Sequence, residues 1–322
     1  MIIQILVLIV SCFVLSWLST GLIKTLIDIA KFLKLREFMI GFFVMAFATS
    51  LPNFFIGVSS ALRGMPELSF GDVMGGNLVD LTLAIALAGL LCRKALIAKS
   101  DMVQNSAIFT AVIAILPLLL VFDGTVSRID GVILLLAFTV YTFWIFSKQE
   151  RFTKVYEVET AKKKTPIFSF QKFLKDIFKF LGLIALLLLT SQIVIGNALY
   201  FSESLGISIS MVGILIVGLG NCFPEIYFSI ISSRKGENWM VLGNLMGSVI
   251  VCSTLVLGTV AIICPIRIFD FSPFLTARIF LICAVLVFLF AMRTGKKIDK
   301  KESLLLLSIY ILFLITEIFI KF

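Results

Sequence analysis

Histidine is absent from the 322 residues of this chain, and only 15% of the residues are charged. Without histidine, any protonation chemistry near neutral pH falls to carboxylates, thiols or lysines. The six cysteines lie scattered in apolar segments and include no pair at the C-x-x-C spacing, which argues against a disulfide framework and against a zinc site. They are Cys12, Cys92, Cys222, Cys252, Cys264 and Cys283.

Apolar residues dominate what is present. They make up 60% of the chain, and the mean hydropathy is +1.12, far above that of a soluble domain. The apolar runs are about 20 residues long or longer and lack the alternation of barrel strands. The first run has no basic residue before it and no cleavage site after it, so we expect a retained span rather than a signal peptide. The sequence therefore predicts an all-α integral membrane protein.

Ten transmembrane spans are expected along the chain. Several exceed 20 residues, which implies that they are tilted. They lie near 2–28, 38–62, 70–92, 103–122, 130–147, 174–200, 207–233, 239–264, 274–292 and 302–320.

Basic residues are distributed unevenly between the predicted loops. Of the 28 lysines and arginines, 23 fall in alternate loops that include the stretch 148–179. The excess of positive charge marks these loops as cytoplasmic. We therefore expect a multi-pass protein of the cell membrane with both termini outside and a basic cytoplasmic linker at 148–173. The net charge of +9 is then a topology signal, and we expect lipid but no nucleic acid as a partner. The oligomeric state stays open, and a monomer is compatible with the sequence.

Two halves of the chain match when the numbering is shifted by 172. The segment FATSLPNFFIGVSSALRG at 47–64 aligns with LGNCFPEIYFSIISSRKG at 219–236, and GDVMGGNLVD at 71–80 aligns with GNLMGSVIVC at 243–252. The identities fall on glycine and proline, which decide backbone geometry. Residues 1–147 and 174–322 thus form two five-helix repeats. Since five is odd, the second repeat is inverted in the membrane, an arrangement typical of secondary transporters with a central substrate site.

The second and seventh spans contain residues that disfavour a continuous membrane helix. Gly218, Gly220 and Pro224 interrupt the seventh span, and the stretch Ala48–Pro52 does the same in the second. Proline removes one backbone hydrogen bond, and freed carbonyls are tolerated in a membrane where they line a hydrated cavity. We therefore expect both spans to be broken, with free carbonyls that coordinate a cation.

At these motifs the chain resembles the calcium/cation antiporter superfamily, which includes the sodium/calcium exchangers. The family pattern in each half is roughly G-T-S-x-P-E, followed by G-N-x-x-G-S-N. The chain has A-T-S-L-P-N at 48–53 and G-D-V-M-G-G-N at 71–77, then G-N-C-F-P-E at 220–225 and G-N-L-M-G-S at 243–248. The resemblance covers essentially the whole chain. It implies antiport of Ca²⁺ against Na⁺ or H⁺ without a cofactor, by alternating access, with the first and sixth spans sliding over a fixed core.

The chain departs from the family at the ion site. Asn53 stands where the first repeat usually has glutamate, and Cys252 stands where Asp or Asn is common. Conversely, Asp80 supplies a carboxylate where asparagine is common. Cys222 and Gly76 replace serines. These changes imply altered stoichiometry or ion choice within an intact backbone frame.

Calcium prefers six to eight hard oxygen ligands with carboxylates to neutralise it. Two carboxylates balance one Ca²⁺, two Na⁺ or two protons. The hydroxyl and amide candidates have an alternative role as helix caps or cross-links, and the thiols as small apolar packing. The predicted metal ligands are the side chains of Glu225, Asp80, Asn53, Thr49, Ser50, Asn221, Ser248, Cys222 and Cys252, with carbonyls near Ala48 and Gly220.

Other residues of the repeated motifs are expected to have structural roles. Gly71, Gly75, Gly243 and Gly247 repeat at a spacing of four residues and are expected at close helix contacts. Asp72 and Asn244 are expected to serve local structure near a membrane surface.

Two alternative functions remain open, and a third is excluded. A divergent member could carry H⁺ or another divalent metal, or could act as a channel or non-transporting sensor. The stretch FGDV at 70–73 is similar to a motif of intramembrane aspartyl hydrolases. Those enzymes carry a further glycine where this chain has Ser69, and they need a second catalytic aspartate at a matched depth. We therefore expect no enzyme and no catalytic residue.

Overall fold

The computed structural model describes residues 2–32, 37–92, 95–99, 101–147, 170–236, 238–268 and 272–321. Within these ranges the chain is almost entirely helical. Most of the linker predicted at 148–173 lies outside the described residues. Its last four residues, 170–173, already belong to a helix.

The first half of the chain supplies five predicted spans. Its elements are α1 (Ile2–Phe32), α2 (Glu37–Leu62), α3 (Pro66–Val79), the π-helical turn η1 (Asp80–Ala84), α4 (Ile85–Leu91), α5 (Asp101–Leu120), the short 3-10 helix η2 (Val121–Asp123) and α6 (Arg128–Ser147). The third predicted span is therefore one run of α3, η1 and α4.

The second half follows the same plan. Its elements are α7 (Phe170–Leu205), α8 (Ile209–Val212), the π-helical turn η4 (Gly213–Val217), α9 (Gly218–Asn221), α10 (Phe223–Lys235), α11 (Asn238–Val251), the π-helical turn η5 (Cys252–Val256), α12 (Leu257–Ile263), α13 (Ser272–Thr294) and α14 (Lys300–Lys321). Each of the ten predicted spans falls on one of these helices or on a run of helical pieces. Among the described residues, seven helical runs are long and apolar enough to cross a membrane, and α1, α2 and α14 are not among them.

The element bounds recur at the spacing of the sequence repeat. The shift that aligns the two sequence halves carries the first and last residues of α3 onto those of α11, those of η1 onto η5, and those of α4 onto α12. Gly64 and Gly236 are related by the same shift, and both adopt left-handed backbone with φ of 73° and 82°, a conformation that glycine takes at little cost. The π-helical turns, which often mark functional sites, begin at Asp80 and Cys252.

Two short antiparallel pairs join loops from the two halves. β1 (Leu96–Ile97) pairs with β4 (Lys297–Ile298), and β2 (Thr125–Val126) pairs with β3 (Ile266–Arg267). Each pair connects the loop before or after α5 to a loop beside α13. The four strands are two residues long, so they fasten loops together and add little to the core.

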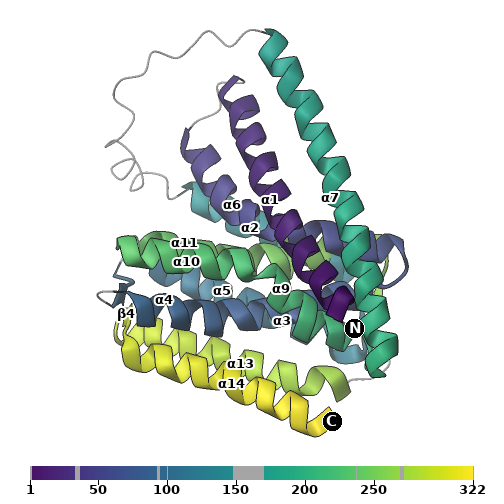
Figure 1. Ribbon diagram of the computed structural model, residues 1–322. Coiled ribbons are helices and arrows are strands. Elements are labelled where there is room, and N and C mark those ends of the chain that lie inside the picture. The colour runs from purple at the N-terminus through teal and green to yellow at the C-terminus, as the bar shows by residue number, and fades with distance from the viewer. Residues whose placement is uncertain are drawn as a thin grey trace.

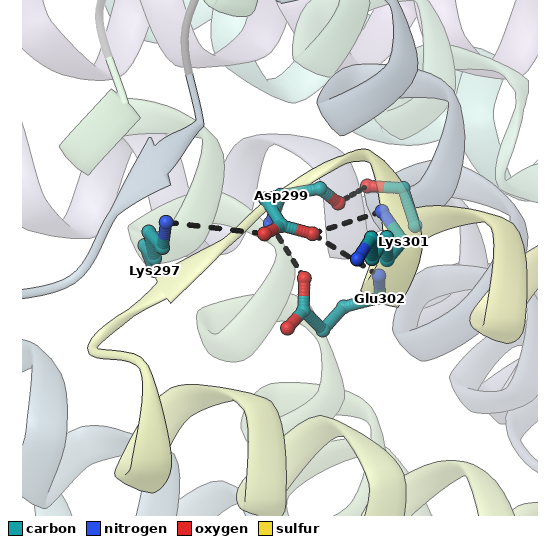
Figure 2. Close-up of polar contacts among 5 residues, drawn as sticks. Lys297, Asp299, Lys301 and Glu302 are labelled. Carbon is teal, nitrogen blue, oxygen red and sulfur yellow. Dashed lines mark hydrogen bonds and ion pairs between the residues drawn. The ribbon is translucent and has the colours of Figure 1, made fainter.

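A capping box opens α14 (Figure 2). The Oδ1 atom of Asp299 accepts hydrogen bonds from the backbone N–H groups of Lys301, at 2.8 Å, and Glu302, at 3.4 Å. In return, the Glu302 carboxylate accepts from the Asp299 N–H at 3.1 Å. Such reciprocal bonds satisfy donors that a helix start leaves free. Hydrogen bonding with Glu302 and the Lys301 N–H lowers the pKa of Asp299 below its ordinary value.

The helices form two packed groups. Figure 1 shows α1 and α7 side by side and steeply inclined to the stacked helices α3, α4, α10, α11, α13 and α14. A smaller core contains Leu15 of α1 and Leu187 of α7, both fully buried, together with residues of α2, α3, α8 and η4. The larger core lies between the stacked helices and includes Phe70 and Phe288. The α1–α7 pair contacts the other helices mainly through α2, with smaller contacts to α8, α9 and η4.

The break predicted in the second span is wrong. α2 runs as a single helix from Glu37 to Leu62 with Pro52 inside it. Ending a helix in lipid would free several backbone groups at once, whereas passing through one proline loses a single hydrogen bond. The seventh span is interrupted as predicted, because α9 ends at Asn221 and α10 starts at Phe223. There Pro224 falls in the first turn of α10, where a missing N–H costs little.

Glycines bring α3 against the seventh span. A Cβ atom at Gly71 would lie 2.2 Å from the carbonyl oxygen of Ser210, and one at Gly75 would lie 2.1 Å from that of Ile214. The close contacts predicted for these two glycines are therefore confirmed. The prediction for Gly243 is wrong, because this glycine is exposed and no described atom lies within 4 Å of its Cβ position. Gly247 is buried.

Candidate functional site

Polar side chains gather where α2, η1, α9–α10 and α11–η5 meet. Glu225 is fully buried, and Asn53, Asp80, Asn221 and Ser248 are at most 2% exposed. They come from segments far apart in the sequence, and the two carboxylates lie at a π-helical turn, for Asp80, and in the first turn of a helix, for Glu225. Buried polar groups normally have hydrogen-bond partners, so the partners of these residues decide what the cluster can do.

Glu225 and Asp80 form a buried pair of carboxylates. Glu225 lies in the first turn of α10, where the helix dipole favours negative charge. Neither of its carboxylate oxygens accepts a hydrogen bond. Thr49 faces this carboxylate, but its hydroxyl donates instead to the Oδ1 atom of Asn244 at 3.3 Å.

Asp80 opens the π-helical turn η1. Its carboxylate lies within hydrogen-bonding reach of Ser248 and Cys222, and its Oδ1 atom has no partner. Glu225 lies close enough to interact electrostatically with it. In the described part of the chain no lysine or arginine forms an ion pair with either carboxylate. The pair therefore offers several free oxygens and uncompensated negative charge.

The corresponding pair from the other repeat is neutral. The Nδ2 atom of Asn53 donates to the Sγ atom of Cys252 at 3.3 Å. The shift between the repeats relates Asn53 to Glu225 and Cys252 to Asp80, so equivalent residues interact in both repeats, by a hydrogen bond in one and electrostatically in the other. One copy carries two carboxylates and the other carries an amide and a thiol.

A second repeated contact flanks the first. The Nδ2 atom of Asn221 donates to the Oδ1 atom of Asp72 at 2.9 Å, and its counterpart is the Thr49–Asn244 hydrogen bond. Asp72 and Asn244, expected to serve local structure near a membrane surface, are buried between helices at 0% and 2% exposure, and each takes part in one of these hydrogen bonds. α3 begins at Pro66, four residues before the predicted span, and the seventh span covers it. The sequence repeat could have indicated that the two residues are buried, because it aligns Asp72 with Asn244 in a motif next to the contacting glycines.

The two thiols of the cluster already have partners. The Sγ atom of Cys222 donates to the carbonyl oxygen of Gly76 at 3.6 Å, and Cys252 accepts from Asn53 and lies within hydrogen-bonding reach of Ser50. Both are buried. As cation ligands they remain predictions, and sulfur is a poor partner for hard cations.

Two backbone carbonyls lose their usual donor. In an α-helix the N–H of residue i donates to the carbonyl of residue i−4, and proline has no N–H. Pro52 and Pro224 therefore leave the carbonyls of Ala48 and Gly220 without that bond. The predicted ligands thus include two carbonyl oxygens that the helices do not use in the ordinary way.

In the ranges that the structure covers, no group of three or more histidine, cysteine, aspartate or glutamate side chains has the geometry of a metal centre. A cation held here would rely on one or two carboxylates with amide, hydroxyl and carbonyl oxygens. That ligand set suits hard cations. It does not resemble a resident transition-metal site.

Comparison with known proteins agrees with these features. The profile of the sodium/calcium exchanger protein family matches residues 3–147 and 175–319. The sodium/calcium exchanger MaX1 of Methanosarcina acetivorans is 23% identical over 334 residues, covering 94% of this chain and 95% of that protein. The inner membrane protein YrbG of Escherichia coli is 25% identical over 228 residues, 70% of each chain.

Solved structures share the fold. The sodium-calcium exchanger NCX_Mj, soaked with 100 mM Na⁺ and 10 mM Sr²⁺, superposes with a TM-score of 0.62 at 22% identity, covering 97% of this chain and 98% of that one. The family match spans both halves of the chain and most of its length. This multi-pass membrane protein therefore belongs to the sodium/calcium exchanger protein family, which is a family of cation antiporters.

Proposed function

We propose that this chain is a secondary active antiporter that exchanges Ca²⁺ for Na⁺ or H⁺ at a site centred on Glu225 and Asp80. The observation that carries the proposal is a pair of buried, interacting carboxylates with free oxygens and no cationic partner among the described residues. A charged side chain at mid-bilayer costs about 2.5–3.5 kcal/mol on insertion scales. A bound cation would remove much of that cost, so the occupied site is favoured.

Competition for the same charge provides the coupling. Two carboxylates balance one Ca²⁺, two Na⁺ or two protons, so one kind of ion displaces the other. The remaining ligands in the proposal are the amides of Asn53 and Asn221, the hydroxyls of Thr49, Ser50 and Ser248, and the carbonyls of Ala48 and Gly220. Exchange follows if the loaded protein crosses between its two orientations more readily than the empty one.

The fold supports alternating access between inverted repeats. We propose ten spans in two inverted sets of five, with both termini outside and residues 148–173 cytoplasmic. The element bounds recur at the shift that aligns the two sequence halves, which supports the repeat. The extensive contact of α1 with α7, whose buried residues lie outside the larger core of the stacked helices, supports a pair that slides over the stack, since these two are the first and sixth spans.

The glycine contacts support a state that is closed on one side. The contacts at Gly71 and Gly75 bring the outer parts of the third and seventh spans together backbone to backbone. The repeat counterpart of Gly71, Gly243, is exposed, whereas that of Gly75, Gly247, is buried. At Gly243 the inner part of the eighth span therefore has no such backbone contact among the described residues. In the proposed topology this asymmetry corresponds to a site closed toward the outside and open toward the cytoplasm.

A divergent ion choice is the second candidate. The Asn53–Cys252 contact removes one carboxylate that the family usually carries and places sulfur beside the site. Fewer charges and a softer ligand would favour protons or another divalent metal over Ca²⁺. A channel or sensor without exchange is the remaining alternative.

Ion flux in proteoliposomes tests these functions against each other. We expect an outward Na⁺ or H⁺ gradient to drive uptake of radiolabelled Ca²⁺ above its equilibrium level, and Glu225→Gln to abolish that uptake. Glu203→Gln is the matched control, because this glutamate is exposed at the end of α7. Uptake that only follows the Ca²⁺ gradient would indicate a channel. Uphill uptake of Mn²⁺ without Ca²⁺ would favour the second candidate.

A further inference from the structure

A buried hydrogen bond joins the α1–α7 pair to α2. The Oγ atoms of Ser59 in α2 and Ser191 in α7 lie 2.6 Å apart, and both residues are 0% exposed. Ser191 donates its single hydroxyl hydrogen to the carbonyl oxygen of Leu188 at 2.8 Å. Ser59 is therefore the donor of the bond between the two helices, which we call the Ser59–Ser191 bond.

The neighbouring hydroxyls behave differently. Ser60 and Thr190, each next in sequence to one partner of the Ser59–Ser191 bond, donate to carbonyl oxygens of their own helices. Such bonds back to the helix are the common way for serine and threonine to satisfy a hydroxyl in a membrane helix. Because Ser59 reaches another helix instead, its bond depends on where α7 lies relative to α2.

The surroundings of the Ser59–Ser191 bond are apolar. Phe55 of α2 belongs to the smaller core together with Leu187 and Val194 of α7, and the two helices pack against each other. Apolar contacts have no preferred direction, so such surfaces can slide past each other at little cost. A hydrogen bond requires a defined distance and angle. The Ser59–Ser191 bond therefore favours one position of α7 on α2.

The bond lies on the outer side of the proposed ion site. Ser59 follows Asn53 by six residues in α2, which is about 9 Å along the axis at 1.5 Å per residue. The displacement is toward Leu62, the end of α2 that the proposed topology places outside. Opening a passage from the outside to the site requires α7 to leave α2 at this level. The bond is thus present when the outer side is closed and is lost when that side opens.

The repeat does not supply an equivalent bond on the inner side. The shift that aligns the two halves carries the start of α2 onto the start of α8, and it relates Ser191 to Ser19 and Ser59 to Ile231. Isoleucine has neither a donor nor an acceptor in its side chain. The corresponding contact of the first span with the seventh therefore lacks this bond, and the two orientations of the protein are not equal in energy.

We propose that the Ser59–Ser191 bond is a latch that keeps the outer passage closed and biases the protein toward the orientation open to the cytoplasm. The inference rests on the proposed function, because it takes the chain to alternate between two orientations. A hydrogen bond between membrane helices changes an equilibrium constant about threefold on average. The latch should therefore lower the population of the outward-open orientation about threefold, and it weakens the apparent affinity for external Ca²⁺ to the same degree.

The native thiol of Cys12 in α1 reports opening of the outer side. Its Sγ atom lies 3.0 Å from the Cβ position of Gly220, and the residue is 5% exposed. Movement of the α1–α7 pair away from α9 would admit reagents from the outside to this thiol. The assay adds a membrane-impermeant maleimide outside right-side-out vesicles and follows the modification of Cys12 by mass spectrometry of its peptide.

Ser59→Ala removes the latch and should raise the rate of Cys12 modification about threefold. Ser60→Ala is the matched control, since it removes the neighbouring hydroxyl, which bonds only within α2, and it should leave the rate unchanged. Ser191→Ala removes the same latch from the other helix and keeps the test available if Ser59→Ala fails to fold. The double variant should match a single one, because one bond can be lost only once.

Two results would overturn the latch: equal rates of Cys12 modification in Ser59→Ala and the unmodified protein, or effects of the two substitutions that multiply in the double variant. The modification needs no ion flux, so the latch and the exchange fail separately. Equal rates alongside uphill Ca²⁺ uptake would reject the latch alone. A threefold rise in a protein without uphill uptake would support the latch and contradict the proposed function.

Discussion

The contact between α3 and the seventh span makes a sharp prediction about stability. Gly71→Ala would place a Cβ atom 2.2 Å from the carbonyl oxygen of Ser210. Ordinary contacts between such atoms lie near 3.5 Å, so the two backbones must separate by about 1 Å. Backbone atoms cannot rotate away as a flexible side chain can. Overpacking of this kind costs about 1–3 kcal/mol, and we expect Gly71→Ala to lower the free energy of unfolding by that amount.

Gly243→Ala is the matched control at the same place in the other repeat. No described atom lies within 4 Å of its Cβ position, and the residue is exposed within α11. Alanine is favoured over glycine in a helix by about 0.8–1.0 kcal/mol, so this substitution should be neutral or stabilising. The two alanine variants should therefore shift stability in opposite directions.

Thermal unfolding of the purified protein, followed by the fluorescence of its three tryptophans, measures the difference. A change of 1 kcal/mol shifts Tm by about 2–4 °C in soluble domains of 150–250 residues, so we expect the two variants to differ by several degrees. Equal Tm values for Gly71→Ala and Gly243→Ala would refute the asymmetric packing. A lower Tm for Gly243→Ala than for Gly71→Ala would refute it as well.

Two further predictions concern single residues. Asn53→Glu adds a carboxylate beside Cys252 and should lower Tm in a Ca²⁺ chelator, because a buried unpaired charge costs about 2.5–3.5 kcal/mol. Added Ca²⁺ should then raise the Tm of this variant more than that of the unmodified protein. An equal rise in Tm would contradict a role for the added carboxylate in binding Ca²⁺. Asp299 caps α14 with a lowered pKa, so its stabilisation is present above the unfolded pKa of about 3.9 and is lost as pH falls through the lower folded value. The Tm deficit of Asp299→Ala should therefore be present at pH 7 and vanish in strong acid, and a deficit that persists there would argue against the capping role.

Much of the helical framework could be predicted from the sequence, because the length of an apolar run and the positions of glycine and proline are local signals. The alignment of Pro52 with Pro224 and of Gly64 with Gly236 located the repeat, and the helix bounds follow its spacing. The alignment also made Asn53 the counterpart of Glu225. The hydrogen bond of Asn53 with Cys252 and the electrostatic interaction of Glu225 with Asp80 follow the same relation.

The features that could not be predicted from the sequence depend on contacts between helices. Asp72 looked like a residue near a span end, and only the packing of the seventh span shows that it is buried. Gly71 and Gly243 are indistinguishable by spacing, yet one meets backbone and the other open space. The helix through Pro52 was missed because proline alone does not decide between a broken helix and a continuous one. The π-helical turns carry no residue signature that the sequence could show.

Ca²⁺ binding at equilibrium, with Na⁺ as competitor, tests the central carboxylate pair most directly. The account predicts that the purified protein binds one Ca²⁺ per chain at the pair, that Na⁺ displaces it, and that Glu225→Gln and Asp80→Asn each abolish binding. Glu203→Gln should leave binding unchanged. Ca²⁺ binding that persists in both Glu225→Gln and Asp80→Asn, or that Na⁺ and H⁺ do not displace, would contradict the assignment of the exchange site to these two residues.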